Sequence, residues 1–192
     1  MKNILVIHGH PVKDTFIDCL KDSYIESARN AGAEVRELVL RELQFEINFR
    51  EGYRGNQALE PDLVNAQQQI LWANHLIFFY PNWWATYPAQ LKGFIDRTLL
   101  PGFAFKYASN GKPHLKLLKG KTARLVVTMD SPVWYYYLIM KAPGHHSMRK
   151  AILEFCGIKP VRINSLGSMR KSTEKQRLRW INRMKKYGRN MN

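Results

Sequence analysis

The sequence predicts an α/β fold, a doubly wound parallel β-sheet with helices on both faces. Short runs of apolar residues such as "NILVI" and "HLIFF" are nearly continuous, which is the pattern of strands buried on both sides. Helical stretches separate these runs, and this alternation favours a parallel sheet. With 192 residues and a hydrophobic content of 45%, we expect a single domain spanning residues 1–192 with a substantial core.

The chain begins with a strand, a helix and a second strand. Residues 3–7, "NILVI", form the first strand. Residues 15–31 are predicted as a helix because apolar side chains recur on one side and Gly32 follows as a stop signal. Residues 34–40 form the second strand. Residues 41–60 carry aromatics and glycines without periodicity, so we expect irregular structure there.

Strands and helices continue to alternate over the rest of the chain. The remaining strands are predicted over residues 75–80, 122–129 and 161–166. The remaining helices are predicted over residues 61–73, 88–99, 146–155 and 173–187. Pro61 suits the first turn of its helix, and Gly157 ends the helix before the last strand.

Five strands and five helices fit the flavodoxin-like strand order 2-1-3-4-5. In this order, ligands bind beyond the carboxyl ends of the strands, at the switch point between strands 1 and 3. The loops after strands 1, 3 and 4 begin "HGHP", "YPNWWATYP" and "TMDSP". We therefore expect these three loops to meet at one ligand pocket.

The first loop, "GHPVKDTFI", leads into a helix N-terminus. Free backbone N–H groups and the helix dipole favour an anion there, and His10, Lys13 and Thr15 add donors and charge. The sequence has no GxGxxG and no GxxxxGK[ST] motif, so a dinucleotide-type Rossmann turn and a P-loop are not supported. The alternative is that Asp14 or Thr15 only caps the helix.

The second loop carries Trp83 and Trp84 between Pro81 and Pro88. These rings offer flat apolar surfaces on a stiffened backbone, against which a planar heteroaromatic ligand can lie. The alternative is that both tryptophans pack between the sheet edge and a helix.

Two further segments are rich in aromatics. The third loop, "TMDSPVWYYY", provides Thr128, Asp130 and three tyrosines after Trp134. The segment "PGFAFKY", residues 101–107, follows a helix end and is expected to have no strand partner. We expect such a segment to close over a site or to contact a neighbouring subunit.

The net charge is +15, and it concentrates at the C-terminus, where "MRKSTEKQRLRWINRMKKYGRN" holds nine basic residues and one acidic residue. Such a charge attracts polyanions, namely nucleic acid, anionic lipid or phosphorylated ligands. The alternative is a solvated helix face. Leu178, Ile181, Met184 and Tyr187 provide an apolar stripe with which this helix docks.

Cysteine, histidine and hydropathy patterns limit the other classes. Cys19 and Cys156 have no metal-binding spacing, and we expect both to be small core residues in a reducing compartment, hence a cytoplasmic protein. No carboxylate or cysteine completes a metal shell with His8 and His10, so no metal is expected. No run approaches the length of about 20 apolar residues that spans a bilayer.

Several motifs together carry a family resemblance: "GHP" after strand 1, "YPNWWATYPAQLKGFIDR" around strand 3, "PGFAFKY", a Thr at the end of strand 4, and "ILEFCGI". With them the chain resembles, nearly end to end, the NAD(P)H:quinone oxidoreductase family of flavoproteins. This group includes the modulator-of-drug-activity and potassium-efflux ancillary proteins. The resemblance implies a bound flavin, FMN or FAD, and a two-electron ping-pong cycle. NADH or NADPH delivers hydride and leaves, and a quinone or nitroaromatic then receives it.

The resemblance also implies roles for individual residues. Flavin contacts fall on His10, Thr15, Phe16, Ile17, Pro81, Asn82, Trp83, Trp84, Ala85, Thr128, Met129 and Asp130. Tyr136 and His145 match catalytic positions. Substrate contacts fall on Trp84, Trp134, Phe105 and Tyr107. The last two match residues that cover the site from a partner subunit, which implies a homodimer.

One departure and two alternatives stand beside this interpretation. Relatives have Thr-Thr-Gly-Gly where this chain has "TMDS", and an ionised Asp130 would oppose an anionic reduced flavin. We therefore expect Asp130 to point outward or to hydrogen-bond the backbone. One alternative function is a regulatory flavoprotein subunit of a membrane transporter with weak reductase activity. The other is nucleic-acid binding through the C-terminal helix, although we expect no nucleic-acid partner.

Overall fold

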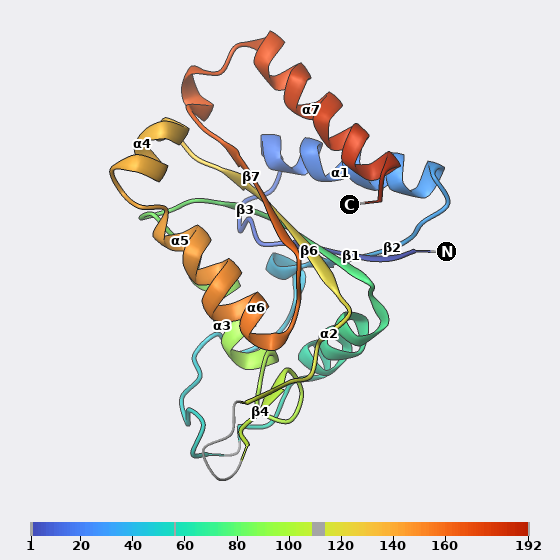
Figure 1. The fold of residues 1–192 in the computed structure, drawn as a ribbon, viewed down its shortest axis with the longest axis vertical. Coiled ribbons are helices and arrows are strands. Elements are labelled where there is room, and N and C mark those ends of the chain that lie inside the picture. Colours follow the sequence, from blue (N-terminus) through green and yellow to red (C-terminus); the bar gives the residue numbers. More distant parts are fainter. Residues whose placement is uncertain (1, 56, 109–113, 192) are drawn as a thin grey trace.

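The computed structural model describes residues 2–55, 57–108 and 114–191, and it is built on a five-stranded sheet (Figure 1). The strands are β1 (Asn3–His8), β2 (Glu34–Val39), β3 (His75–Pro81), β6 (Thr122–Thr128) and β7 (Val161–Leu166). All four pairings are parallel, in the order β2-β1-β3-β6-β7. Counted over these five strands, this is the predicted order 2-1-3-4-5, which is confirmed.

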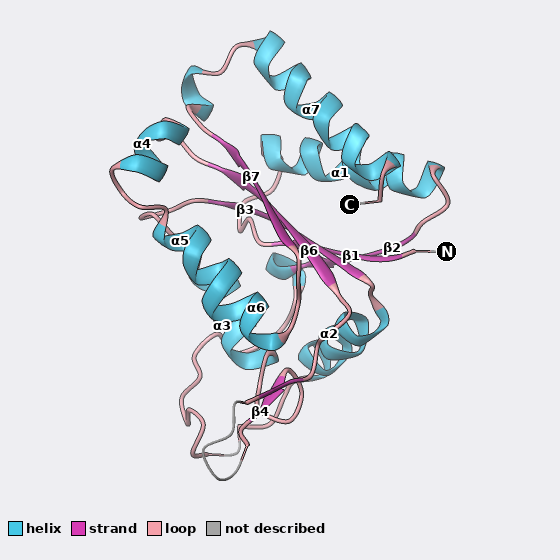
Figure 2. Ribbon diagram, in the orientation of Figure 1, coloured by secondary structure: helices cyan, strands magenta, loops and turns pink. Residues whose placement is uncertain are grey.

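Helices form a layer on each side of the sheet (Figure 2). One layer holds α1 (Phe16–Asn30) and α7 (Glu174–Arg189). The other layer holds α2 (Pro61–Trp72), α3 (Ala89–Thr98) and a third, continuous helix. This helix consists of α5 (Pro143–His146), the π-helical stretch η2 (Ser147–Leu153) and α6 (Glu154–Cys156). Each layer buries its own apolar cluster against one face of the sheet.

Local chemistry explains where these elements begin and end. The Asp18 carboxylate accepts hydrogen bonds from the backbone N–H and the hydroxyl of Thr15, at 2.9 Å and 2.6 Å, and this fixes the start of α1. Pro61 occupies the first turn of α2. Gly157, at φ 101°, ends α6 in the left-handed region, as predicted from its position.

Two predictions about irregular segments are wrong. Residues 101–107 do have a strand partner, because β4 (Phe105–Lys106) pairs antiparallel with β5 (Leu115–Lys116). The segment after β6 is not all loop, because α4 (Val133–Leu138) begins directly after Pro132. The short turns η1 (Leu40–Glu42) and η3 (Met169–Lys171) complete the elements.

Burial corrects two expectations, and the start of one helix corrects a third. Cys156 is buried as expected, but Cys19 is exposed on α1. Leu178 does not belong to the docking stripe of α7, because its side chain is exposed while Met184 is buried. The helix predicted to begin at His146 begins at Pro143. Among the described helices, none has both the length and the apolar character that crossing a membrane requires.

Candidate active site

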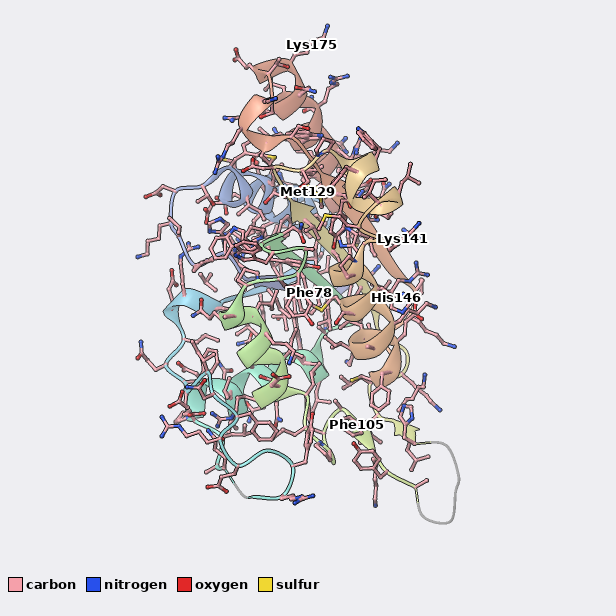
Figure 3. All side chains as sticks on the ribbon, turned by 90° about the vertical axis from the view of Figure 1, so that its left-hand side faces the viewer. Phe78, Phe105, Met129, Lys141, His146 and Lys175 are labelled. Carbon is pink, nitrogen blue, oxygen red and sulfur yellow. The ribbon has the colours of Figure 1, made fainter. Side chains whose placement is uncertain are left out.

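A cavity of about 410 Å³ lies at the carboxyl ends of β3 and β6, where the strand order predicts a ligand site. It is lined by Pro81, Asn82, Trp83, Trp84, Ala85, Thr128, Met129, Asp130, Ser131, Met140 and Met169. In Figure 3 the cavity residue Met129 is labelled in the upper half of the molecule, and Phe105 is labelled near the opposite, lower end. The second and third loops therefore meet as predicted, because the backbone N–H of Asn82 donates to the carbonyl of Thr128 at 2.7 Å.

The tryptophan loop is a tight turn with two strained residues. Trp83 and Thr86 exchange both backbone hydrogen bonds, at 2.8 Å and 3.0 Å. Between them, Trp84 and Ala85 have φ values of 50° and 63°, in the left-handed region that side chains disfavour. The turn leaves the Trp84 side chain fully exposed at the rim of the cavity. Backbone strain of this kind persists where surrounding structure enforces it, and it is common at ligand sites.

The enforcing structure lies directly behind the turn. The buried hydroxyl of Tyr136 donates to the carbonyl of Ala85 at 3.0 Å and accepts from the N–H of Gly144 at 3.1 Å. Gly144 also donates to Ala85, at 3.0 Å. A Cβ atom on Gly144 would lie only 2.6 Å from that same carbonyl oxygen, so the close contact requires glycine. Tyr136 thus supports the turn from behind and is not a wall of the cavity.

His145 is the next residue along this support. Its Nε2 atom lies 2.7 Å from the hydroxyl oxygen of Ser165, and its ring packs edge-on against Tyr136 with centroids 4.9 Å apart. Burial removes water from the ring and lowers the pKa of His145 to about 4. The imidazole is therefore neutral at pH 7.

The first loop joins the site through His10. Its ring contacts that of Trp83 edge-on, with centroids 5.9 Å apart, and its Nδ1 atom accepts a hydrogen bond from the N–H of Val12 at 3.0 Å. Burial lowers the pKa of His10, although the backbone contact to Val12 and the nearby charge of Asp18 oppose this. His10 thus connects the start of α1 to the tryptophan turn.

A charged cluster lies beneath the first loop. Nε2 of the buried His8 and Nη2 of Arg41 lie 2.7 Å and 3.2 Å from the Asp18 carboxylate. Burial would raise the pKa of Asp18, but the hydrogen bonds from Thr15 and the charges of His8 and Arg41 outweigh it, and the pKa is lowered. Since burial lowers the pKa of His8 to about 4, Arg41 is the cation that neutralises Asp18 at pH 7.

Asp130 borders the cavity and is paired with a neighbouring arginine. Its carboxylate accepts hydrogen bonds from the backbone N–H of Arg170 at 3.1 Å and from Nε of the same residue at 2.9 Å. The expectation that Asp130 hydrogen-bonds the backbone is therefore confirmed. The neighbouring guanidinium offsets the negative charge that would oppose an anionic ring.

The donor set fits a planar ring with carbonyl groups and an attached phosphate. Among the hydrogen bonds of the described residues, none engages the backbone N–H of Trp84, Ala85 or Asp130, which all border the cavity. Among the described residues, the backbone N–H groups of Phe16 and Ile17, in the first turn of α1, also have no hydrogen-bond partner. Flat apolar walls with free N–H donors at one end and a helix N-terminus nearby suit a flavin mononucleotide moiety.

The structure brings together most of the predicted flavin contacts, but not all. Eight of the twelve line the cavity, and His10 touches it through Trp83. Thr15 caps α1, the Phe16 ring packs against Trp180 with centroids 6.1 Å apart, and the Ile17 side chain is buried in the core. The side chains of Phe16 and Ile17 therefore pack into the protein. Only their backbone N–H groups are available to a ligand at the start of α1.

Apart from Trp84, the predicted catalytic and substrate residues do not line the cavity. Tyr136 and His145 lie behind its turn, and Trp134 is exposed on α4. Phe105 and Tyr107 line a different cavity of about 190 Å³ at the other end of the molecule (Figure 3). Within one chain they do not reach Trp84, and their assigned role in a homodimer stays a prediction.

Three residues of the cavity were not predicted from the sequence, and neither was the supporting residue Arg41. Ser131, Met140 and Met169 line the cavity, and Arg41 neutralises Asp18 beneath the first loop. Met169 follows the carboxyl end of the fifth sheet strand, so the strand order alone could have indicated it. Met140 and Arg41 lie in segments without a periodic signal. Within the described ranges, no group of three or more His, Cys, Asp and Glu side chains could hold a metal ion.

Comparison with known proteins agrees with this geometry. A family model described as the flavodoxin-like fold matches residues 2–187. The chain belongs to this flavodoxin-like family. Among similar curated proteins is an uncharacterized NAD(P)H oxidoreductase of Haemophilus influenzae, which is 29% identical over 180 residues, covering 91% of this chain and 88% of the relative. The ribosyldihydronicotinamide dehydrogenase [quinone] of Mus musculus is 27% identical, covering 96% and 91% of the two chains.

Solved structures of the flavodoxin-like fold superpose on this chain. Smu.1420 from Streptococcus mutans has a TM-score of 0.78 and 28% identity, covering 98% of this chain and 99% of the other. An FMN-dependent NADH-azoreductase from Bacillus anthracis, solved in complex with FMN, has a TM-score of 0.77 and covers 100% and 99% of the two chains. The identity to the azoreductase is 17%, so this likeness concerns the fold.

Proposed function

We propose that this chain is a flavin-dependent NAD(P)H oxidoreductase that reduces quinones or nitroaromatics by two-electron, ping-pong hydride transfer. The observation that carries the proposal is the strained turn, which holds Trp84 at the rim of a cavity bordered by unengaged N–H groups. The names of the relatives in Haemophilus influenzae and Mus musculus support the same reaction class.

Each part of the site has a role in this proposal. When bound, a flavin would supply the chemistry of hydride transfer between NAD(P)H and the aromatic acceptor. Trp83, Met129 and Met140 provide apolar contact surface for the ring, and the N–H groups of Trp84 and Ala85 meet its carbonyl edge. The first turn of α1 holds the phosphate through backbone N–H groups. Tyr136 acts as a positioning residue, because it reaches the site only through the carbonyl of Ala85.

The proposal includes a homodimer. In a single chain Trp84 is fully exposed, so a hydride acceptor bound at the rim of the cavity would be exposed to solvent. In the proposed dimer, Phe105 and Tyr107 of the partner subunit cover that rim, which excludes water and strengthens polar contacts to the substrate. These two residues lie far from the cavity of their own chain, which supports assigning them to the site of the partner.

The decisive experiment is the visible absorption spectrum of purified, gently desalted protein, before and after NADPH and then a quinone. We expect oxidised-flavin bands that bleach with NADPH and return with the quinone. Trp84→Ala should lower flavin retention or turnover about tenfold, the size of effect that follows loss of one stacking contact of about 1.4 kcal/mol. Leu178→Ala, which changes an exposed apolar side chain on α7, is the matched control. A colourless protein that takes up neither FMN nor FAD would overturn the proposal.

A further inference from the structure

The helix α4 exposes an apolar surface that the proposed reaction does not use. Trp134, Tyr135, Leu138 and Ile139 form this surface, the α4 face, with Leu138 64% and Ile139 60% exposed. Of the residues of α4, only Tyr136 is buried. Exposed aliphatic and aromatic side chains gathered on one short helix mark an interaction surface.

The positive charge of the chain is concentrated in its last third, which contains α4. Residues 131–192 contain fourteen Lys and Arg residues and two acidic residues, a net charge of +12. Residues 1–130 contain sixteen basic and thirteen acidic residues, a net charge of +3. Between residues 131 and 153 there is no acidic residue at all. The last third of the chain is therefore strongly cationic while the rest is nearly balanced.

Basic side chains border α4 at both of its ends. Lys141 follows the helix, and the turn η3 with Arg170 and Lys171 lies beside its start. The N–H of Ser168 donates to the carbonyl of Ser131 at 3.3 Å, and a Cβ on Gly167 would lie 2.8 Å from a Val133 methyl carbon. Arg170 pairs with Asp130, but no ion pair among the described residues involves Lys141 or Lys171. Figure 1 shows α4 beside the segment that leads from β7 to α7.

We propose that the α4 face inserts into the headgroup region of an anionic lipid bilayer, with Lys141 and Lys171 contacting lipid phosphates. Trp and Tyr prefer the membrane–water interface, Leu and Ile favour the acyl boundary, and flanking cations attract anionic headgroups. All three groups of residues are present within one short segment and its neighbours. The charge complementarity selects an anionic surface as the occupant.

Two other occupants fit these observations less well. A second copy of the chain packed through a two-fold axis would place the same basic residues against each other, with no acid between residues 131 and 153 to pair with them. Nucleic acid would use the cations and could stack on the aromatics, but it gives Leu138 and Ile139 no hydrocarbon partner.

The contact would bring the Met140 side of the cavity close to the lipid surface, beside the rim that the partner subunit covers in the proposed dimer. Met140 directly follows the α4 face and lines the cavity together with Trp84. Resting on the proposed function, this placement assigns lipid-dissolved quinones as the acceptor class. The membrane contact itself requires no turnover and is tested without NAD(P)H or quinone, so its failure and failure of the proposed function are separate results.

The test is co-sedimentation of the purified holoprotein with vesicles of phosphatidylcholine, with or without anionic phosphatidylglycerol. We expect binding to the mixed vesicles only, weakened by high salt. The double variant Leu138→Ser, Ile139→Ser should lower the partition coefficient about tenfold. Lys141→Glu should lower the partition coefficient at least about fivefold, because loss of one basic residue alone has about this effect and the substitution also adds a negative charge.

Two control variants make the same kinds of substitution away from the α4 face. Leu178→Ser alters an equally exposed leucine on the basic helix α7, and Lys159→Glu makes the same charge change at the opposite end of β7. Both should bind within twofold of the unaltered chain. Absence of binding to anionic vesicles, or undiminished binding by the α4 double variant, overturns the proposal. The proposal is also overturned if the double variant dissociates an oligomer while its vesicle binding persists. It is overturned as well if the protein binds single-stranded DNA more tightly than vesicles through the same α4 residues.

Discussion

At the scale of single residues, the hydroxyl of Tyr136 stabilises the tryptophan turn. It is buried and serves two backbone groups at once, the carbonyl of Ala85 and the N–H of Gly144. Because Gly144 also donates to Ala85, the carbonyl keeps one partner if the hydroxyl is lost. The hydroxyl therefore adds stability and position to an arrangement that the backbone already defines.

Tyr136→Phe should lower the free energy of unfolding by about 1–2 kcal/mol, because the ring volume is kept while one buried hydrogen-bond network is lost. Urea denaturation of the flavin-free protein measures this. Tyr137→Phe is the control, since the exposed Tyr137 hydroxyl lies 3.2 Å from the Ser165 hydroxyl and its loss should change stability by less than about 0.5 kcal/mol. Equal effects of the two substitutions would refute the assigned role.

At the scale of elements, the turn over residues 83–86 is held in a conformation that costs stability. Trp84 combines a φ of 50° with a fully exposed side chain, so it contributes strain without packing. A left-handed conformation costs an ordinary residue about 1 kcal/mol, which glycine does not lose. The turn is therefore less stable than it would be with glycine at position 84. The strained backbone keeps the indole of Trp84 exposed.

Trp84→Gly should raise the free energy of unfolding of the flavin-free protein by about 0.5–1 kcal/mol, after allowing for the greater entropy of unfolded glycine. Trp84→Ala keeps the strain and should give no such increase. Both substitutions should weaken flavin retention, because both remove the ring. A Trp84→Gly protein that is less stable than Trp84→Ala would show that the left-handed turn is not a source of strain.

The elements also show what sequence patterns can and cannot reveal. The strands β1, β3 and β6 are buried almost throughout and gave a continuous apolar signal, so the sheet, its order and the meeting of the loops were predicted. The pairing of β4 with β5 was missed because two-residue strands have no detectable period. The helix α4 was missed because "VWYYYL" is aromatic on every side. Phe105 and Tyr107 could be assigned only through the resemblance, since nothing local links them to the cavity.

At the scale of the whole molecule, stability should depend on three buried histidines. Burial lowers the pKa of His8 and His145 to about 4 and that of His75 to about 3, whereas an unfolded histidine titrates near about 6.5. Between these values the unfolded chain binds more protons than the folded chain. The free energy of unfolding therefore rises with pH across this window. The contribution is complete above about pH 6.5 and is lost as the pH falls towards 4.

His145→Gln tests the share of one histidine, because glutamine keeps a polar partner for Ser165 and does not titrate. A pKa lowered from about 6.5 to about 4 corresponds to about 3 kcal/mol at most, so the unaltered protein should lose about 2–3 kcal/mol more than the variant between pH 7 and pH 4.5. Urea midpoints at these two pH values measure the difference. His146→Gln, at the exposed neighbouring position, should leave the slope unchanged. Identical slopes for the His145 variant and the unaltered chain would mean that His145 takes up its proton without unfolding, through an opening of the contact between α5 and β7.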